Sequence, residues 1–449
     1  MNEIGRLRGA SLAELPDPLE VPWPRALAGE LRPPPSKSLS HRYLALALLL
    51  GGERRVDELL EAEDIGLFRE ALRVLGLIVE ASGRDVVVRG QLAPAGEEPR
   101  QLHCGNAGTM FRFLTAALTT LPGRFVLDGT PRLRERPIGP LVEALREAGA
   151  RIEYLGVPGC APLMIEGRSL AGGHCRIDAG ESSQYLSALL MAGLRAKGAL
   201  TVEVAALTSE PYVALTRQAM QRLEVDRVSA VGGVWRVDPL PPGPGGGPGR
   251  VEVEPDFSAA AYPAAAAALI GGPVELLGLS SDSVQGDRRF LDLLAELGAR
   301  VEWTRRGVLV ASGAPLRSLS LDLSDMPDQV PTLAALAAFG EGDTEISGVA
   351  NLRLKESDRL AAVAVGLRTL GFCAKETSDG LIVRGQPQRL SGNFSPLPPA
   401  VVDTRDDHRI AMAFALVGLR RAGTRIAAPA VVAKSYPGFW RDLLGLISE

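Results

Sequence analysis

The chain contains 449 residues, of which 46% are hydrophobic and 23% are charged, and its formal net charge is −4. This composition is typical of a globular protein with two or three domains. The small negative charge excludes the broad basic surface on which general nucleic-acid binding depends. No apolar run approaches the ~20 residues of a membrane span, so we expect no membrane association. The four cysteines lack the paired spacing of a metal site, and we interpret them as reduced thiols of a cytoplasmic protein.

The first predicted helix with functional side chains begins near Ser38, directly after the stiff segment 32–35, which contains three prolines. Residues 35–42 read Pro-Ser-Lys-Ser-Leu-Ser-His-Arg, with Lys37 at the mouth of the helix and Arg42 one turn after Ser38. A helix start exposes unpaired backbone N–H groups and the positive end of the helix dipole. With hydroxyl groups and cations added, it fits a phosphate or a carboxylate. A capped helix with exposed cations explains the same residues equally simply.

Other predicted helix starts carry the same kind of signature. Residues 105–112 read Gly-Asn-Ala-Gly-Thr-Met-Phe-Arg, in which the glycines let the backbone approach a ligand closely. Residues 134–138 place two arginines before a helix with Pro137 in its first turn. Residues 181–184 read Glu-Ser-Ser-Gln and open a helix predicted over 185–193, although two serines can serve as a cap alone. Several such starts in one chain indicate a substrate with several anionic groups.

A repeat of about 74 residues runs through the chain. A helix ending in Leu-x-x-x-Gly is followed at once by an alternating apolar strand, with the glycine at 76, 149, 298 and 371 and Glu224 in the glycine place of a degenerate copy. The spacings are 149 − 76 = 73, 224 − 149 = 75, 298 − 224 = 74 and 371 − 298 = 73. We expect the glycines to end their helices in the left-handed conformation. This period is longer than that of a solenoid and predicts a compact α/β subdomain used several times.

Two breaks in composition predict a division into two lobes. One is the proline segment at 32–35, and the other is the Pro/Gly tract at 239–249, between the third and fourth repeats. A surface loop is the alternative explanation of the tract. If residues 12–31 belong with the far lobe, the chain crosses between the lobes twice and forms a double hinge.

The second half of the chain contributes carboxylates beside cations. Asp328 precedes an apolar helix predicted over 330–339, for which it is at least a candidate N-cap. Residues 351–359 read Asn-Leu-Arg-Leu-Lys-Glu-Ser-Asp-Arg. We expect the lysine and the second arginine to share a helix face with the glutamate beside them, although charge runs of this kind are usually structural. The segments Asp-Asp-His-Arg at 406–409 and Lys-Ser-Tyr-Pro at 434–437 complete the charged motifs.

The absence of several well-known motifs reduces the number of reaction types that fit the sequence. It contains no Walker sequence, no G-x-G-x-x-G loop, no G-x-S-x-G elbow and no credible triad among its four histidines. What remains is a set of cations and hydroxyl groups with two candidate acid/base carboxylates. That set suits proton transfer on anionic substrates.

Taken together, these motifs resemble the 5-enolpyruvylshikimate-3-phosphate (EPSP) synthase family. The resemblance covers the chain from about residue 32 to about 440 and rests on seven segments in family order, at 35–42, 105–112, 134–139, 182–184, 355–359, 407–409 and 434–437. Two positions depart from the family pattern: Pro35 stands where the family often has glycine, and Glu210 stands where some members carry lysine.

The resemblance implies an α/β fold of two lobes, an inside-out α/β barrel in which each lobe consists of three βαβαββ repeats. We expect one lobe at 33–249, on the shikimate 3-phosphate side. The other lobe is expected at 1–32 plus 250–449, on the phosphoenolpyruvate and acid/base side, with the active site in the cleft between them.

The implied activity is transfer of the enolpyruvyl group of phosphoenolpyruvate to the 5-hydroxyl of shikimate 3-phosphate, with release of phosphate. It proceeds by addition and elimination through a tetrahedral intermediate, in the pathway to chorismate and the aromatic amino acids. The resemblance implies no metal and no organic cofactor, and the two small-molecule substrates are the expected partners of a monomer. Gly108 matches family members that are sensitive to the inhibitor glyphosate.

The motifs also imply roles for single residues. Asp328 is expected to act as the base at the 5-hydroxyl, Glu356 to protonate the methylene carbon and later remove a proton, and Lys37 to reach both substrates. The residues implied to bind shikimate 3-phosphate are Lys37, Ser38, Arg42, Ser182, Ser183, Gln184, Ser209, Asp328, Asn351 and Lys355. Those implied to bind phosphoenolpyruvate are Lys37, Asn106, Gly108, Arg136, Gln184, Arg359, Arg409 and Lys434. Nearby cations lower a carboxylate pKa and burial raises it, and the sequence leaves this balance open.

Two alternatives remain at this point. The sister enolpyruvyl transferase that acts on UDP-N-acetylglucosamine shares the fold, but its first motif carries Lys-Asn in place of Lys37-Ser38 and it usually has a loop cysteine. A non-catalytic anion-binding scaffold would keep the cations but would have no need for both Asp328 and Glu356.

Overall fold

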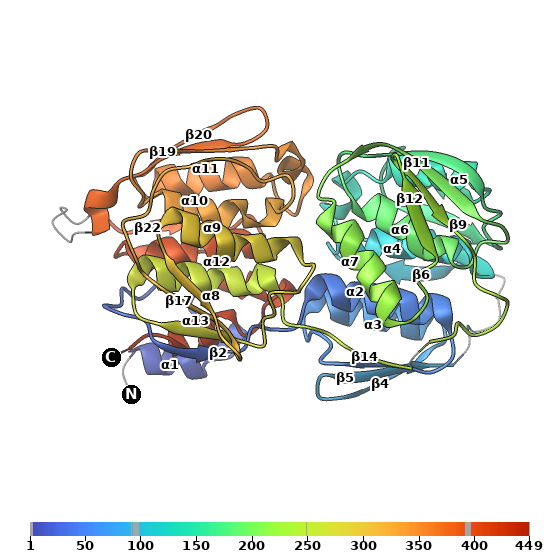
Figure 1. Ribbon diagram of the computed structural model, residues 1–449, viewed down its shortest axis with the longest axis horizontal. Helices are drawn as coiled ribbons and strands as arrows, with labels where there is room; N and C mark the ends of the chain where they lie inside the picture. Colours follow the sequence, from blue (N-terminus) through green and yellow to red (C-terminus); the bar gives the residue numbers. More distant parts are fainter. Residues whose placement is uncertain (1–2, 91, 93–97, 248, 391–396, 449) are drawn as a thin grey trace. The chain divides into compact units, whose positions relative to one another are not determined.

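The computed structural model of the chain describes residues 3–90, 92, 98–247, 249–390 and 397–448. The chain forms two compact units. The first, here named the central unit, is the continuous stretch Pro35–Glu254. The second, the terminal unit, combines Met1–Pro34 with Pro255–Glu449 (Figure 1).

The central unit contains three four-stranded sheets with one common topology. Their strand orders are β14-β3-β5-β4, β6-β7-β9-β8 and β10-β11-β13-β12. In each sheet the first two strands are parallel, and the later pairs are antiparallel. The strands are β3 (Arg54–Asp57), β4 (Ile78–Ser82), β5 (Asp85–Arg89), β6 (Arg100–His103), β7 (Gly123–Asp128), β8 (Arg151–Tyr154), β9 (Leu163–Gly167), β10 (Gly173–Ala179), β11 (Leu200–Leu207), β12 (Val228–Val231), β13 (Val234–Val237) and β14 (Arg250–Glu252).

The terminal unit repeats this plan with one shortened copy. Its sheets have the orders β16-β17-β15-β2, β18-β19-β21-β20 and β1-β23-β22. In the three-stranded sheet, β1 from the start of the chain pairs antiparallel with β23 in the place of the usual hairpin. The strands are β1 (Leu19–Glu20), β2 (Gly29–Leu31), β15 (Val274–Leu277), β16 (Arg300–Trp303), β17 (Gly307–Ala311), β18 (Ser320–Asp322), β19 (Asp343–Ser347), β20 (Cys373–Glu376), β21 (Leu381–Arg384), β22 (Ala400–Val402) and β23 (Thr424–Ile426).

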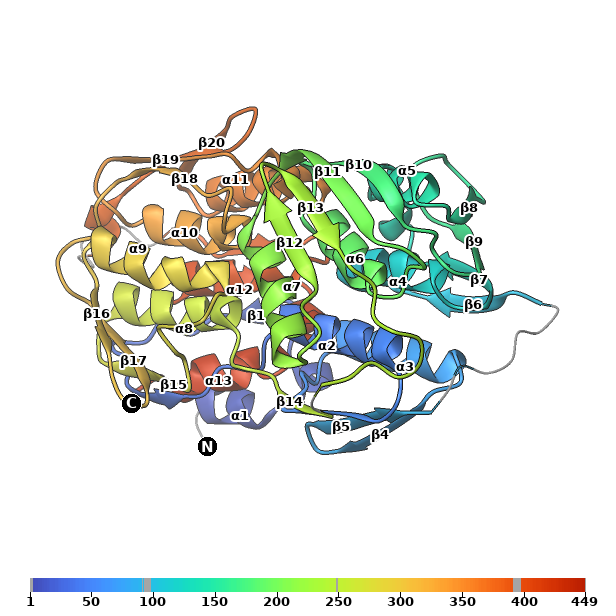
Figure 2. The same ribbon diagram turned by 45° about the vertical axis from the view of Figure 1, so that its right-hand side comes forward.

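Three nearly all-apolar helices form the centre of each unit. In the central unit they are α2 (Lys37–Leu50), α4 (Gly108–Thr119) and α6 (Gln184–Gly193), which pack against one another (Figure 2). In the terminal unit they are α8 (Phe257–Ile270), α10 (Val330–Ala337) and α12 (His408–Gly418). Almost every residue of these inner helices is buried, as expected of helices that are apolar on all sides.

The remaining helices bury only one face. They are α1 (Glu3–Gly9), α3 (Glu63–Val74), α5 (Gly139–Glu147), α7 (Pro211–Arg222), α9 (Arg289–Leu297), α11 (Arg359–Thr369) and α13 (Phe439–Gly445). In α9, for example, the buried residues Phe290, Leu294 and Leu297 follow the spacing of one helix face.

The predicted repeat and its left-handed helix ends are confirmed. Gly76, Gly149, Gly298 and Gly371 have φ angles of 98°, 94°, 113° and 84°, and Glu224 has the same conformation with φ 55°. They follow α3, α5, α9, α11 and α7, and they precede β4, β8, β16, β20 and β12. Gly445, 445 − 371 = 74 residues later, is the last residue of α13 and does not have a positive φ.

The predicted unit limits need correction because, at each crossing between the units, the last strand pairs in the unit that the chain is leaving. Strand β2 pairs with β15 of the terminal unit, yet the next inner helix, α2, belongs to the central unit. Conversely, β14 pairs with β3 of the central unit, and the following α8 belongs to the terminal unit. Ladder hydrogen bonds therefore hold residues 250–252, expected in the second lobe, in the first. Pro33 and Pro34, expected in the first lobe, lie in the terminal unit.

The Pro/Gly tract lies within the central unit, and the boundary between the units follows it, after Glu254. Its described residues belong to the central unit: the Leu240 N–H donates to the Leu194 carbonyl at 2.9 Å, and the Gly245 N–H donates to the Leu50 carbonyl at 2.7 Å. Pro248 lies outside the described residues. The tract runs over the ends of inner helices and delivers the chain to β14.

Glu224 is sterically strained at its positive φ, because its Cβ atom crowds the backbone. The four glycines at equivalent positions have no Cβ atom and avoid this strain. We expect Glu224→Gly, at this exposed site, to raise the free energy of unfolding by up to about 1 kcal/mol. The matched opposite change, Gly149→Ala, should lower it, since its Cβ would also lie 3.0 Å from that of Ala171. Urea unfolding measures both, and a destabilised Glu224→Gly variant would contradict the assignment.

Candidate active site

The charged motifs of the sequence lie at the starts of the inner helices. The helices α2, α4 and α6 begin at Lys37, Gly108 and Gln184, and α12 begins directly after Asp407. Asp328 lies in the short 3-10 helix η4 (Pro327–Gln329), which leads into α10. The N-terminal ends of these helices therefore carry most of the predicted site residues, where exposed N–H groups favour anions.

At the start of α2, Lys37 and Arg42 have different environments. The Lys37 ammonium lies 3.3 Å from the carboxylate of Asp64. The buried Arg42 donates to the Ser38 carbonyl at 2.9 Å, to the Thr216 hydroxyl at 2.8 Å and to the Tyr212 carbonyl at 2.7 Å. Arg42 thus joins α2 to α7, the helix that follows Ser209.

His41 stabilises the same helix start from inside the core. Its Nδ1 lies 3.0 Å from the Lys37 carbonyl, which can only accept, so Nδ1 carries the proton. Burial lowers the pKa of His41 to about 4; Asp64 opposes this shift, and Lys37 and Arg42 reinforce it. The imidazole is therefore neutral at neutral pH.

A chain of hydrogen bonds fixes the amide of Gln184 at the start of α6. Arg112 donates to its Oε1 at 2.8 Å, and its Nε2 donates to the Thr109 hydroxyl at 3.0 Å. Arg112 and Tyr185 both donate to the Pro137 carbonyl, at 3.3 and 2.7 Å. This network ties α4, α6 and the segment before α5 together.

Gly108 allows the guanidinium group of Arg136 to lie against the start of α4. A Cβ atom at position 108 would lie 2.6 Å from the Arg136 Cζ, so no other residue fits without moving that side chain. Arg136 donates to the backbone carbonyl of Asn106 at 3.1 Å. The structure therefore brings Asn106, Gly108 and Arg136 together. The helix α5 begins at Gly139, after Pro137, so the prediction that Pro137 lies in its first turn is wrong.

The three predicted serines lie at one edge of the third sheet. Ser182 and Ser183 follow β10, and Ser209 follows β11. The last residues of these parallel strands, Ala179 and Leu207, are partners in the ladder. All three serines are buried, and Ser209 has a positive φ of 52°.

In the terminal unit, Arg359 is the centre of a buried ion cluster. The cluster joins Arg359, Asp328, Glu356, Asp407 and Arg409. Arg359 donates through NH1 to Asp328 at 2.8 Å, through NH2 to Glu356 at 2.7 Å and through Nε to Asp407 at 2.7 Å. Its side chain is 2% exposed. Both predicted acid/base carboxylates therefore contact the same guanidinium group.

Arg409 and Asp407 complete this cluster from the start of α12. Arg409 donates through NH2 to the second carboxylate oxygen of Asp328 at 2.8 Å. Asp407 accepts from the Arg409 N–H at 2.9 Å as the helix cap and from the Ser357 hydroxyl at 3.1 Å. Tyr262 of α8 lies 3.5 Å from Arg409 NH1.

Cations determine the ionisation of Asp328. Burial by itself would raise the pKa of this carboxyl, but the charges of Arg409, Arg359 and Lys355 outweigh burial and the opposing charge of Glu356. The pKa of Asp328 is therefore well below its ordinary value, and the group is a carboxylate at neutral pH.

Two local predictions are wrong. Lys355 and Arg359 do not share a helix face, because Lys355 has an extended backbone after the 3-10 helix η5 (Ala350–Leu354) and α11 starts only at Arg359. Asp358 ends the predicted helical register by capping α11, with its side chain accepting from the Ala361 N–H at 3.0 Å. Asp328 is not a helix cap either, since that position of α10 is taken by Gln329.

Asn351 and Lys434 are buried at the ends of 3-10 segments. Asn351 lies in η5, which packs on α11, and Lys434 ends η7 (Pro429–Lys434), which packs on α12. Both segments therefore neighbour the helices whose first residues form the Arg359 cluster.

Among the residues outside the predicted set that belong to these clusters are Thr109, Arg112, Ser357 and Asp407. All four stand inside the quoted motifs, so the motifs themselves were the signal. Asp287 of the 3-10 helix η3 (Gly286–Arg288) had no such signal. It is buried and accepts from the Ser258 hydroxyl, and burial, with the charge of Asp328, raises its pKa to about 6.

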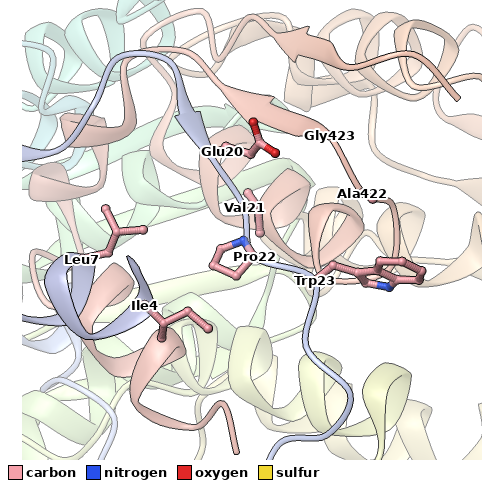
Figure 3. A pocket seen from close by; sticks show the side chains of 8 residues that line it. All are labelled: Ile4, Leu7, Glu20, Val21, Pro22, Trp23, Ala422 and Gly423. Atoms are coloured by element: carbon pink, nitrogen blue, oxygen red, sulfur yellow. The ribbon is translucent and has the colours of Figure 1, made fainter. Parts of the chain in front are cut away.

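A separate pocket of the terminal unit is lined by apolar residues together with Glu20. Figure 3 shows its lining side chains, Ile4, Leu7, Glu20, Val21, Pro22, Trp23, Ala422 and Gly423. It contains none of the predicted site residues. Within the described ranges, no group of three or more His, Cys, Asp and Glu side chains could hold a metal ion. No helix in the described part of the chain is long and apolar enough to span a bilayer.

Comparison with known proteins identifies the family. The family model described as EPSP synthase (3-phosphoshikimate 1-carboxyvinyltransferase) matches residues 22–443. The chain belongs to the EPSP synthase family. It is 44% identical over 419 residues to a 3-phosphoshikimate 1-carboxyvinyltransferase of Syntrophobacter fumaroxidans, covering 92% of this chain and 96% of the relative. It is 41% identical over 426 residues to one of Vibrio vulnificus, covering 94% and 96%.

Solved structures agree with this assignment. An EPSP synthase structure from Acinetobacter baumannii superimposes with a TM-score of 0.75 at 29% sequence identity, covering 94% of this chain and 96% of that one. The two-lobed enolpyruvyl transferase fold expected from the motifs is thereby confirmed. This chain is an enzyme of the shikimate pathway that transfers the enolpyruvyl group from phosphoenolpyruvate to shikimate 3-phosphate, in a family that is the target of glyphosate.

The buried His41 predicts a pH-dependent stability. Its folded-state pKa of about 4 lies below the unfolded value of 6.5, so the unfolded chain binds the proton more readily and stability is lost as the pH falls from 6.5 towards 4. At about pH 5 the loss from this group is about 2 kcal/mol relative to neutral pH. Urea unfolding of His41→Asn should lack that component, whereas the exposed control His174→Asn should keep it. An unchanged pH dependence in His41→Asn would contradict the assignment.

Gly108→Ala should displace the Arg136 guanidinium, because the new Cβ would overlap it. We expect the KM for phosphoenolpyruvate to rise about tenfold, while the KM for shikimate 3-phosphate changes little. The matched control is Gly66→Ala in α3, whose Cβ would meet nothing within 4 Å. Steady-state kinetics with each substrate varied in turn measures both constants. Equal changes in both KM values would argue against a specific role of Gly108 beside Arg136.

Proposed function

We propose that the clusters of the two units supply one active site, in which each substrate takes binding groups from both. Shikimate 3-phosphate would be bound by Lys37, Ser38, Arg42, Ser182, Ser183, Gln184, Ser209, Asp328, Asn351 and Lys355. Phosphoenolpyruvate would be bound by Lys37, Asn106, Gly108, Arg136, Gln184, Arg359, Arg409 and Lys434. The concentration of these residues at helix starts supports an anionic pair of ligands.

The proposed chemistry is addition followed by elimination at the 5-hydroxyl of shikimate 3-phosphate. Glu356 donates a proton to the methylene carbon of phosphoenolpyruvate, which leaves cationic character on the neighbouring carbon. The 5-hydroxyl oxygen bonds to that carbon and gives its proton to Asp328. The tetrahedral intermediate then loses phosphate, which takes from Asp328 the proton that came from the hydroxyl. Glu356 removes a proton from the new methyl group to restore the double bond.

One observation carries this assignment: Asp328 and Glu356 contact the two terminal nitrogens of the same buried Arg359. Two carboxylates are thus fixed near each other in a charged, largely buried environment. That arrangement allows one proton donor and one proton acceptor to serve a single reacting molecule. Lys37, at the start of α2, would stabilise charge that develops on the phosphoryl oxygens.

We further propose that the enzyme acts as a monomer in the cytoplasm. The four cysteines, none of which forms a disulfide, suit a reducing compartment. Each unit closes a large apolar core with elements of this one chain.

Glu356→Gln tests the acid/base assignment, because the amide keeps the shape but cannot donate a proton to carbon. We expect turnover to fall by about 10²- to 10⁴-fold, while binding of phosphoenolpyruvate survives. Phosphate release should require shikimate 3-phosphate and should not occur with UDP-N-acetylglucosamine. The control is Glu341→Gln, the same change at an exposed carboxylate of the same unit. Unchanged turnover in Glu356→Gln would remove this residue from its role.

A further inference from the structure

The Arg359 cluster contains an ion pair that stands in the way of the proposed binding of phosphoenolpyruvate. Asp328 uses both carboxylate oxygens on guanidinium groups, one at 2.8 Å from Arg359 NH1 and the other at 2.8 Å from Arg409 NH2. These arginines are two of the groups that the proposed function assigns to the substrate. An anion that takes these two N–H groups must displace Asp328 from them.

The carboxylates of the cluster differ in how firmly they are held. Asp407 has no exposed side-chain surface, caps α12 and accepts from Ser357 as well as from Arg359, so its removal would disturb the backbone. The Asp328 side chain is 22% exposed and lies in a single-turn 3-10 segment. Of these two, Asp328 is the group that can give way at lower cost.

We propose that Asp328 is a built-in counter-ion of Arg359 and Arg409, that the anionic end of phosphoenolpyruvate replaces it there, and that this exchange frees Asp328 to accept the proton of the substrate hydroxyl. The proposal rests on the proposed function and adds an order of events to it. The base becomes available only in the molecules that already hold phosphoenolpyruvate.

Electrostatics give this exchange two consequences. Before it, Asp328 neutralises two mostly buried guanidinium groups that would otherwise pay a desolvation penalty. After it, burial and the charges of Glu356 and Asp287 favour the protonated carboxyl, so its basicity rises. Lys355 and Arg359 from the η5–α11 segment, Arg409 and Asp407 at the start of α12 and Tyr262 from α8 are further ionisable groups of its surroundings.

In the proposed exchange, Asp328 competes with phosphoenolpyruvate for the two arginines and therefore weakens the binding of phosphoenolpyruvate. Replacing it with the neutral, similarly shaped asparagine removes the competitor and leaves two guanidinium groups in need of an anion. Asp328→Asn should therefore bind phosphoenolpyruvate at least about tenfold more tightly than the wild type in the absence of shikimate 3-phosphate. Its turnover should fall severely, because it has lost the base.

Isothermal titration with phosphoenolpyruvate measures this affinity, and thermal unfolding shows that the variant is folded. Asp325→Asn is the matched control, since it makes the same charge change at an exposed position just before η4. Asp328→Ser is a second variant that removes the charge with a different side chain. Tighter binding by both Asp328 variants, and not by Asp325→Asn, is the expected result.

Unchanged or weaker binding by folded Asp328 variants would overturn the exchange, and so would equal tightening by Asp325→Asn. Phosphate release by the wild type separates this failure from that of the proposed function. If the wild type needs shikimate 3-phosphate for phosphate release but the Asp328 variants bind phosphoenolpyruvate no more tightly, only the exchange is refuted. If the wild type releases phosphate without shikimate 3-phosphate, the proposed function itself is refuted.

Discussion

The N–H groups of a buried guanidinium need hydrogen-bond acceptors, and at Arg359 three carboxylates fill this need and organise that part of the terminal unit. Asp328 contacts NH1 of that side chain, Glu356 contacts NH2, and Asp407 contacts Nε and NH2. The three carboxylates come from three separate segments of the chain. Removing one partner of such a cluster leaves an uncompensated charge, which is strongly destabilising. The same contacts therefore hold together α12, η4 and the segment before α11, and they fix the two carboxylates that we propose as acid and base.

Helix starts are the second organising feature, and they follow from the repeat. In each sheet the parallel pair of strands brackets an inner helix, except where the chain passes between units and the strand comes from elsewhere. Each inner helix of an unbroken copy thus begins beyond the carboxyl end of a parallel strand, which is where ligands bind in α/β proteins. Because the copies share a topology, several helix starts with their N–H groups become available for phosphate and carboxylate groups.

Pairing with the arginines and the proposed proton transfer place opposite demands on Asp328 and Glu356. Without a ligand, the cations of the terminal unit need Asp328 and Glu356 as partners, and this pairing keeps Asp328 ionised but weakly basic. For the proposed proton transfer, the same groups must be free. In the proposed exchange, a substrate with its own anionic groups takes their place beside the arginines. On this proposal, binding an anionic substrate and freeing the acid/base groups are the same electrostatic event.

Sequence and tertiary structure contributed different parts of this picture. The helix starts, the left-handed helix ends and the 74-residue period could be predicted from the sequence. Their signals, a serine before a helix or a glycine after it, depend only on a few neighbouring residues. The motif residues could be named for the same reason. The extended backbone of Lys355 was missed because a helix register was continued through Asp358, whose side chain starts a new helix.

Only the tertiary structure showed with which strands β2 and β14 pair, and these pairings set the unit limits at Pro34 and Glu254. Strands far apart in the chain pair through backbone hydrogen bonds, which produce no local sequence pattern. Ion pairs between distant segments likewise produce no local sequence pattern. The sequence by itself determined the family, the repeat and which cations and carboxylates this protein carries, whereas the fold alone decided that Asp328 and Glu356 share Arg359, because a buried charge takes its partners from whatever segments packing brings beside it.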